Sequence, residues 1–206
     1  MRILTLFLDI FFAPHCISCK WEGKYLCNEC IQNLPPSLFS YEQDIYFFNY
    51  LDEAWMHQAV HLLKYQGITS VFDYYLKERK DKVQDWLLTK NICFIPVPSS
   101  RKRLKQRGYN QAEVLARKMT FFWGGFTAAQ LLKKYERKSL VGRTRIERQL
   151  QATQQFYWGS GTIPEADLYL VIDDVLTTGS TLKACIELVR AHTNKRVMGL
   201  TIAHER

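Results

Sequence analysis

The 206-residue sequence lacks a hydrophobic run long enough to cross a membrane as a helix, which takes about 20 apolar residues. Its first twelve residues, MRILTLFLDIFF, are mostly apolar, but Asp9 interrupts them and no small-residue cleavage site follows before Pro14. These absences argue against a secretory signal and against an integral membrane span. We therefore expect an amphipathic N-terminal helix on a cytoplasmic protein, with contact to a membrane surface as the alternative.

Acidic residues are scarce in one part of the chain. From Ser99 to Leu150 there are fourteen lysines and arginines but only three glutamates, so this window carries +11, whereas the whole chain carries +8. The overall composition, 47% hydrophobic and 23% charged, is that of a globular protein. Concentrated positive charge favours a polyanionic partner such as a phosphate compound or nucleic acid, and a solvated basic surface is the alternative.

Cysteine is also rare, with six residues, yet four of them form two CxxC pairs that seven residues separate. Four sulfur ligands in a tetrahedron suit Zn²⁺ and leave no open position for chemistry, so we expect a structural zinc knuckle. An iron–sulfur cluster is the main alternative, and two disulfides rank lower. The expected metal ligands are Cys16, Cys19, Cys27 and Cys30. The isolated Cys93 and Cys185 are expected in the core.

Leu34, Pro35 and Pro36 mark a joint after this knuckle, because two successive prolines end a helix or an inner strand. We therefore expect an N-terminal region of residues 1–36 and a second domain of residues 37–206. Within the second domain, residues 52–65 predict a helix that ends before Gly67, and residues 77–91 predict a surface helix.

The stretch from Leu168 to Leu182, LYLVIDDVLTTGSTL, is the most informative part of the sequence. Its apolar start predicts a buried strand of a parallel sheet, which ends at Asp173 and Asp174. Apolar residues at helical spacing from Ser180 onward predict a helix. The turn that enters this helix consists of Thr177, Thr178, Gly179, Ser180 and Thr181.

A phosphate group fits such a turn, because free amides at a helix start and the helix dipole both favour an anion. Two carboxylates beside a bound phosphate would repel it unless they face sugar hydroxyls or a cation such as Mg²⁺. A ribose 5-phosphate that carries a metal-bound diphosphate satisfies both conditions. The alternative is an acid pair that only ends a strand and caps a helix.

A second buried strand is predicted at residues 92–98, ICFIPVP, and polar and basic residues follow it at once. Ligands bind at the carboxyl ends of strands in open parallel sheets, so this segment can meet a diphosphate or a nucleic-acid backbone. The candidates for the diphosphate are Ser99, Ser100 and Arg101, and those for DNA are Arg101, Lys102, Arg103, Lys105 and Arg107. Aromatic residues at 121–126 can stack single-stranded bases, although core packing is the favoured interpretation for most of them.

Seven of the fourteen basic residues lie between Lys133 and Leu150, around Gly142, which can act as a hinge. This pattern predicts a mobile basic loop that closes over a departing diphosphate, with a solvated basic helix as the alternative.

Several motifs occur in the order found in the ComF competence-protein family: the four-cysteine knuckle, LKYQG, IPVPSSRKRLKQRGYNQAEVLA, GRTR and VIDDVLTTGSTL. The last one resembles the 5-phosphoribosyl-1-diphosphate (PRPP) motif of type I phosphoribosyltransferases. The resemblance implies an α/β fold, in which a type I phosphoribosyltransferase-like parallel sheet flanked by helices follows an N-terminal four-cysteine zinc knuckle. It also implies that Asp173 and Asp174 hold the ribose hydroxyls and Mg²⁺, residues 177–181 the 5-phosphate, residues 99–101 the diphosphate, and Arg143 the leaving charge.

The same resemblance implies a role in natural transformation, the uptake of single-stranded DNA by bacteria. The protein would bind single-stranded DNA on its basic window, Mg-PRPP in the phosphate site, and the DNA-uptake machinery of the inner membrane. One alternative is an active phosphoribosyltransferase that transfers ribose 5-phosphate from PRPP to an acceptor the sequence does not identify. Another is a regulator that senses PRPP.

Overall fold

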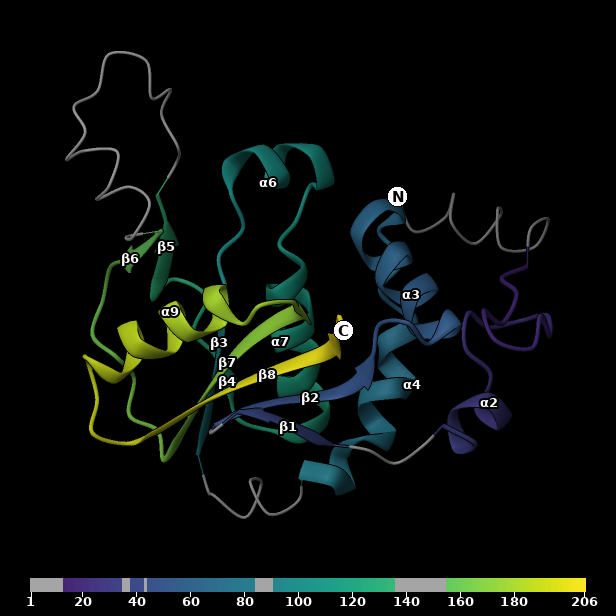
Figure 1. Ribbon diagram of the computed structural model, residues 1–206, viewed down its shortest axis with the longest axis horizontal. Helices are drawn as coiled ribbons and strands as arrows, with labels where there is room; N and C mark the ends of the chain where they lie inside the picture. The colour runs from purple at the N-terminus through teal and green to yellow at the C-terminus, as the bar shows by residue number, and fades with distance from the viewer. Residues whose placement is uncertain (1–12, 35–37, 43, 84–90, 136–154) are drawn as a thin grey trace.

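A computed structural model describes residues 13–34, 38–42, 44–83, 91–135 and 155–206. Within these residues a six-stranded sheet has the order β1-β2-β8-β7-β3-β4, and a separate two-stranded ribbon joins β5 to β6 (Figure 1). The strands are β1 (Phe39–Glu42), β2 (Ile45–Tyr50), β3 (Ile92–Pro96), β4 (Phe126–Thr127), β5 (Leu132–Lys134), β6 (Phe156–Trp158), β7 (Leu168–Leu176) and β8 (Arg196–His204).

Five strands of the large sheet run parallel, and only the edge strand β1 is antiparallel to its neighbour. The central strands are apolar on both faces: all five residues of β3 and the first five of β7 are buried. Such continuous apolar strands need cover on both sides of the sheet. Cys93 lies in β3 and is fully buried, as expected.

Helices provide that cover. The helices are α2 (Asn28–Gln32), α3 (Ala54–His61), α4 (Val71–Glu78), α6 (Arg101–Arg107), α7 (Gln111–Trp123) and α9 (Ser180–Arg190). On one face, Leu170 of β7 shares a core with α4 and α7, and on the other face its neighbour Val171 shares a core with α9. The predicted α/β fold with a parallel sheet flanked by helices is therefore confirmed.

The four-cysteine segment packs beside α4 rather than on the sheet. Leu26 and Ile31 belong to the same core as Phe72 of α4, which joins this segment to the body of the protein. The joint at Pro35 and Pro36 and the expected N-terminal helix lie outside the described residues. None of the helices described is long and apolar enough to cross a membrane.

Three local predictions are not fully matched by the structure. The strand expected to end at Asp173 and Asp174 continues to Leu176, because β8 pairs with it as far as His204. Residues 101–107, expected only as a basic segment that follows the strand, form the helix α6, because the Ser100 hydroxyl caps its first turn and Gly108 ends it with φ of +83°. The surface helix expected at 77–91 is described only in part: α4 ends at Glu78, a 3₁₀ helix follows at Lys80–Val83, and residues 84–90 lie outside the described residues.

The helix predicted for residues 52–65 is confirmed. It consists of α3 and a π-helical segment, Leu62–Gln66, and Gly67 ends it with a left-handed φ of +70°. The apolar residues of α9 are also buried as predicted, among them Cys185 at 0% exposure.

Candidate functional site

The carboxyl ends of β3 and β7 border a crevice. These strands are adjacent and parallel, but β3 leads through α6 to α7 on one face of the sheet, whereas β7 leads to α9 on the other. Where consecutive connections leave a sheet toward opposite faces, the strand ends are open to ligands. The structure has a cleft of about 870 Å³ at this position.

The acid pair lies at the floor of this cleft. The last register pair between β3 and β7 joins Pro96 to Ile172, and the next bond runs from the Val97 amide to the Ile172 carbonyl at 2.9 Å. Beyond that point β7 continues alone on this side, so Asp173 and Asp174 both line the cleft. Their side chains also fix the local backbone, because Asp173 Oδ1 accepts the Asp174 amide at 2.9 Å.

Charge repulsion between the two carboxylates opposes the ionisation of Asp173. Burial, and then the neighbouring Asp174 carboxylate, raise the pKa of Asp173 well above the usual range of an aspartate. A lysine opposes this effect: Lys64 Nζ lies 3.4 Å from Asp174 Oδ2, and its charge lowers the pKa of Asp173. A bound cation such as Mg²⁺ would stabilise both carboxylates in the same way.

Lys64 was not recognised as a site residue from the sequence. It lies in the LKYQG motif, in the π-helical segment that follows α3 and far from β7 in the chain, and only the fold brings it to the acid pair. The LKYQG motif is recognisable in the sequence, but its spacing along the chain does not indicate that Lys64 contacts Asp174.

We expect Lys64→Met to raise the pKa of Asp173 further, because the substitution removes a nearby positive charge that favours the carboxylate. A titration of the aspartate carboxyl carbons by ¹³C NMR measures this shift. The control is Lys183→Met, which removes a lysine paired with Glu42 instead. A pKa of Asp173 that is equal in wild type and Lys64→Met would contradict the electrostatic role of Lys64.

The turn after β7 lies beside the acids. Thr177, Gly179 and Thr181 line the cleft, whereas Thr178 and Ser180 are exposed outside it and share a hydrogen bond of 3.0 Å between their hydroxyls. Gly179 is buried with φ of +73°, and a Cβ there would lie 3.2 Å from the Tyr41 ring. The close approach and the backbone conformation both require glycine. The α9 helix then begins at Ser180, so its first free amides lie at the rim of the cleft.

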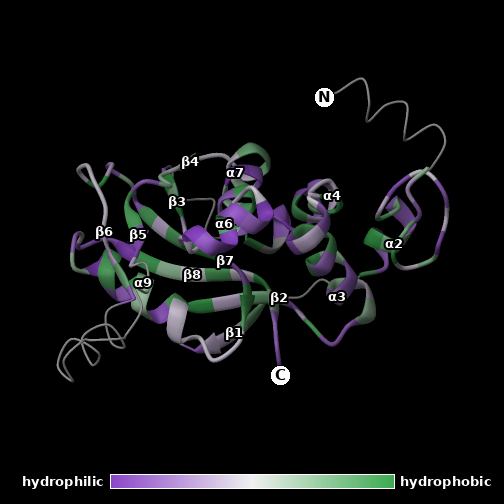
Figure 2. Cartoon of the chain, turned by 90° about the horizontal axis from the view of Figure 1, so that it is seen from above, coloured by the Kyte–Doolittle hydropathy of each residue, from purple (hydrophilic) through white to green (hydrophobic). Residues whose placement is uncertain are grey.

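The basic helix α6 borders the opposite side of the cleft. Three of its expected site residues line the cleft, Lys102, Arg103 and Arg107, together with Ser99 and Ser100 just before the helix. Arg101 and Lys105 are exposed outside the lining. None of the residues of α6 is buried, so the helix stands apart from the sheet at the top of Figure 1 and is among the hydrophilic segments of Figure 2.

Polar contacts at its base hold α6 in place. Asn110 donates to the Val97 carbonyl at 2.9 Å and is 3.0 Å from the Ser99 hydroxyl. Tyr109 donates to the Leu63 carbonyl, which ties the end of α6 to the segment that carries Lys64. The acid pair, the turn and the basic helix are thus brought together by separate contacts.

Other residues of the cleft had no assigned role in the sequence analysis. Tyr65 is 60% exposed, and the Arg107 guanidinium lies 5.3 Å from its ring centre. Further lining residues are Asn110, Gln111, Lys134, Tyr135, Gln155 and Glu205. Lys134 and Tyr135 begin the basic loop, but Gly142 and Arg143 lie outside the described residues.

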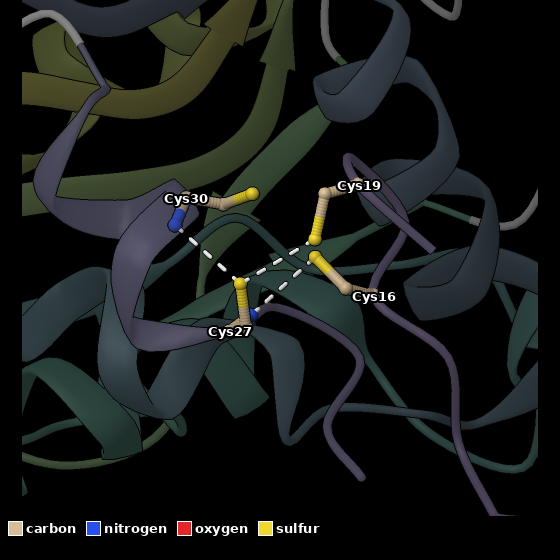
Figure 3. A group of neighbouring side chains, drawn as sticks. All are labelled: Cys16, Cys19, Cys27 and Cys30. Atoms are coloured by element: carbon tan, nitrogen blue, oxygen red, sulfur yellow. Dashed lines mark hydrogen bonds between the residues drawn. The ribbon is translucent and has the colours of Figure 1, made fainter. Parts of the chain in front are cut away.

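The four cysteines of the knuckle form a second candidate site. Their sulfur atoms all lie within 4.8 Å of one another, and Figure 3 shows the side chains turned toward a common centre. Two sulfurs on a tetrahedral Zn²⁺ with bonds of about 2.3 Å lie roughly 3.8 Å apart. The 3.6 Å between the sulfurs of Cys19 and Cys27 is close to that spacing and excludes a disulfide, whose S–S bond is about 2.05 Å.

Backbone amides prepare the cluster for a metal. The Cys27 amide donates to the Cys16 sulfur at 3.4 Å, and the Cys30 amide donates to the Cys27 sulfur at 3.5 Å. Burial raises the pKa of Cys16, but amides from Cys19 and Cys27 outweigh it and lower the value to about 6. The hydroxyl of Ser18 lowers the pKa of Cys30, yet burial and the neighbouring thiols outweigh that effect and raise it. The neighbouring sulfurs thus oppose the deprotonation of Cys30. A structural Zn²⁺ bound to the four sulfurs would remove this repulsion.

Comparison with known proteins identifies a sequence relative and a solved structure that resemble this chain. No family model matches the chain. A crystal structure of TT1426 from Thermus thermophilus resembles it over 63% of this chain and 83% of that chain, at 12% identity and a TM-score of 0.34. Competence protein F of Haemophilus influenzae is 24% identical over 189 residues, which cover 87% of this chain and 74% of that protein. The chain is therefore a distant homologue of competence protein F.

Proposed function

We propose that this protein takes part in DNA uptake during natural transformation, where it binds single-stranded DNA and Mg-PRPP at the cytoplasmic side of the inner membrane. The homology to competence protein F supports the coarser statement, a role related to DNA uptake. The finer statement rests on the chemistry of the cleft and of α6.

The observation that carries the proposal is α6 itself. This seven-residue helix has five lysines and arginines, no acid and no buried residue. Isolated helices of that length are unstable, and α6 gains nothing from core burial, so capping and polar contacts at its base maintain it. A solvent-exposed helix of this charge is suited to a polyanion longer than the cleft, such as a nucleic-acid strand.

The cleft supports the PRPP part of the proposal. Asp173 and Asp174 would hold Mg²⁺ and the ribose hydroxyls, and Thr177, Gly179 and Thr181 would hold the 5-phosphate beside the start of α9. The diphosphate would lie against Ser99, Ser100 and the α6 cations that line the cleft. Thr178 and Ser180, whose side chains lie outside the lining, would contact the 5-phosphate through backbone amides, and Arg101 would contact the diphosphate from outside the lining. Mg²⁺ would supply charge neutralisation of the diphosphate.

The same acid pair and turn also support a second function, an active phosphoribosyltransferase. In that case Arg143 would balance the charge of the leaving diphosphate. Release of diphosphate from PRPP when candidate acceptors are added would distinguish the enzyme from a PRPP-sensing regulator.

Replacing Arg101, Arg103 and Lys105 together by alanine tests the DNA interface. We expect weaker binding to single-stranded oligonucleotides of every sequence, because contacts to phosphates carry no sequence information. Each lost phosphate contact lowers the salt dependence, so the slope of log K against log salt should flatten by about 2 for three contacts to a single strand. Fluorescence anisotropy at several salt concentrations measures both quantities.

The matched control removes Lys195 and Arg196, exposed cations at the opposite end of the sheet, where β8 begins. That variant should keep the wild-type slope. If the α6 variant also keeps it, the DNA interface is elsewhere on the protein.

A further inference from the structure

A groove between α4 and α7 has no role in the function proposed so far. It has a volume of about 580 Å³, and its lining is Asp73, Tyr74, Lys77, Arg117, Lys118, Phe121 and Phe122. From its aromatic and cationic lining we infer that this groove is a stacking site for bases of single-stranded DNA. The inference rests on the proposed function and extends it to a second surface.

The apolar part of the groove is entirely aromatic. Phe121 is 81% exposed and Tyr74 is 41% exposed, so apolar ring surface is in contact with water, and burying it against a ligand would be favourable. Phe121 and Phe122 lie edge to face, with ring centres 5.0 Å apart. No leucine, isoleucine, valine or methionine lines the groove. Grooves that receive a peptide helix are commonly lined by aliphatic residues and methionine, whereas exposed rings beside cations are typical of base stacking.

The charges around these rings favour an anionic partner. The lining has one acid, Asp73, which is paired with Lys118, and three cations, Lys77, Arg117 and Lys118, of which Arg117 also pairs with Glu113 on α7. Lys24 of the knuckle adds a further cation, with its Nζ 4.3 Å from the centre of the Tyr74 ring. Lys77 is exposed in the lining. The local charge is therefore positive, which suits a phosphate backbone whose bases enter the groove.

The groove also lies along the path of a strand bound at α6. The helix α7 begins four residues after α6 ends, and Phe121 lies ten residues along it, about 15 Å at 1.5 Å per residue. Figure 1 shows α7 leading away from α6 beside α4. Arg117 lies one turn before Phe121, so cations and rings follow one another along α7.

Substitutions at Phe121 separate stacking from apolar packing. The probes are single-stranded oligonucleotides, one end-labelled for anisotropy and one with 2-aminopurine at successive positions for base quenching. We expect Phe121→Ala and Phe121→Leu each to weaken binding roughly tenfold and to remove the quenching, because neither residue offers an aromatic face. Phe121→Trp should keep both. Since Phe121 is almost fully exposed, none of these changes should affect folding.

The salt dependence provides a second criterion. Phe121→Ala should leave the slope unchanged, whereas Lys77→Gln should flatten it by about 0.7, the effect of one phosphate contact. If Phe121→Leu binds DNA like wild type, the groove is not a stacking site and an apolar protein partner is the better occupant. If wild type itself binds no single-stranded DNA at low salt, the proposed function fails together with this inference. If wild type binds, the α6 variant weakens binding and Phe121→Ala does not, the inference alone is wrong.

Discussion

Replacing Asp173 and Asp174 together by asparagine is expected to abolish binding of Mg-PRPP. The two carboxylates lie at the floor of the cleft, and asparagine offers neither the charge that Mg²⁺ needs nor two acceptor oxygens for the ribose hydroxyls. Isothermal titration calorimetry should detect no heat of binding with the variant where wild type gives a saturable signal.

The fold should survive this substitution. Asparagine keeps the shape of both side chains and removes the repulsion that raises the pKa of Asp173. Circular dichroism tests this point. The matched control is Asp167→Asn, an exposed acid beside the amino end of the same strand, which should bind Mg-PRPP like wild type. Undiminished heat from the double variant would remove the ribose and metal assignment.

Replacing Cys16 and Cys27 by serine should have the largest effect on stability. Structural zinc contributes on the order of 10 kcal/mol to segments of this kind, and these two residues supply half of the ligands. Leu26 and Ile31 hold the knuckle against α4, so loss of the metal should expose that part of the core. We expect loss of bound zinc by mass spectrometry or elemental analysis, and aggregation of most of the expressed protein.

The control for this variant uses the two buried cysteines outside the knuckle. Cys93→Ala and Cys185→Ala remove thiols in the sheet and in α9, so they should lower stability modestly and retain the full zinc content. A well-folded, metal-free Cys16→Ser/Cys27→Ser protein would contradict the structural role of the metal.

Much of this architecture was predictable from local patterns. Continuous apolar runs predicted β3 and β7, and helical spacing predicted the buried face of α9. The CxxC pairs predicted a cluster because their chemistry is local: tight turns bring both thiols of a pair together. These features depend on residues that are close in the chain, which is where sequence patterns are informative.

The features that the sequence did not predict depend on contacts between segments far apart in the chain. Pairing with β8 extends β7 past the acids, and polar contacts at the base of α6 hold a helix where the sequence indicated only a basic segment. Lys64 reaches Asp174 from another part of the chain. Of the turn residues 177–181, only three line the cleft, because α9 begins immediately and turns Thr178 and Ser180 outward.

The position of α6 links the two proposed ligands. Lys102, Arg103 and Arg107 line the cleft, while Arg101 and Lys105 of the same helix extend the positive surface outside it. A diphosphate in the cleft would therefore neutralise cations that the proposed DNA strand would also contact. We infer that Mg-PRPP and single-stranded DNA compete for this helix.

The most direct test of this account is the anisotropy of a labelled single-stranded oligonucleotide, titrated with the protein at several salt concentrations with and without saturating Mg-PRPP. The account predicts binding that weakens steeply as salt increases and a higher apparent Kd when Mg-PRPP is present. Absence of binding at low salt would contradict the DNA-uptake function. Binding with a Kd that Mg-PRPP leaves unchanged would contradict the shared use of α6.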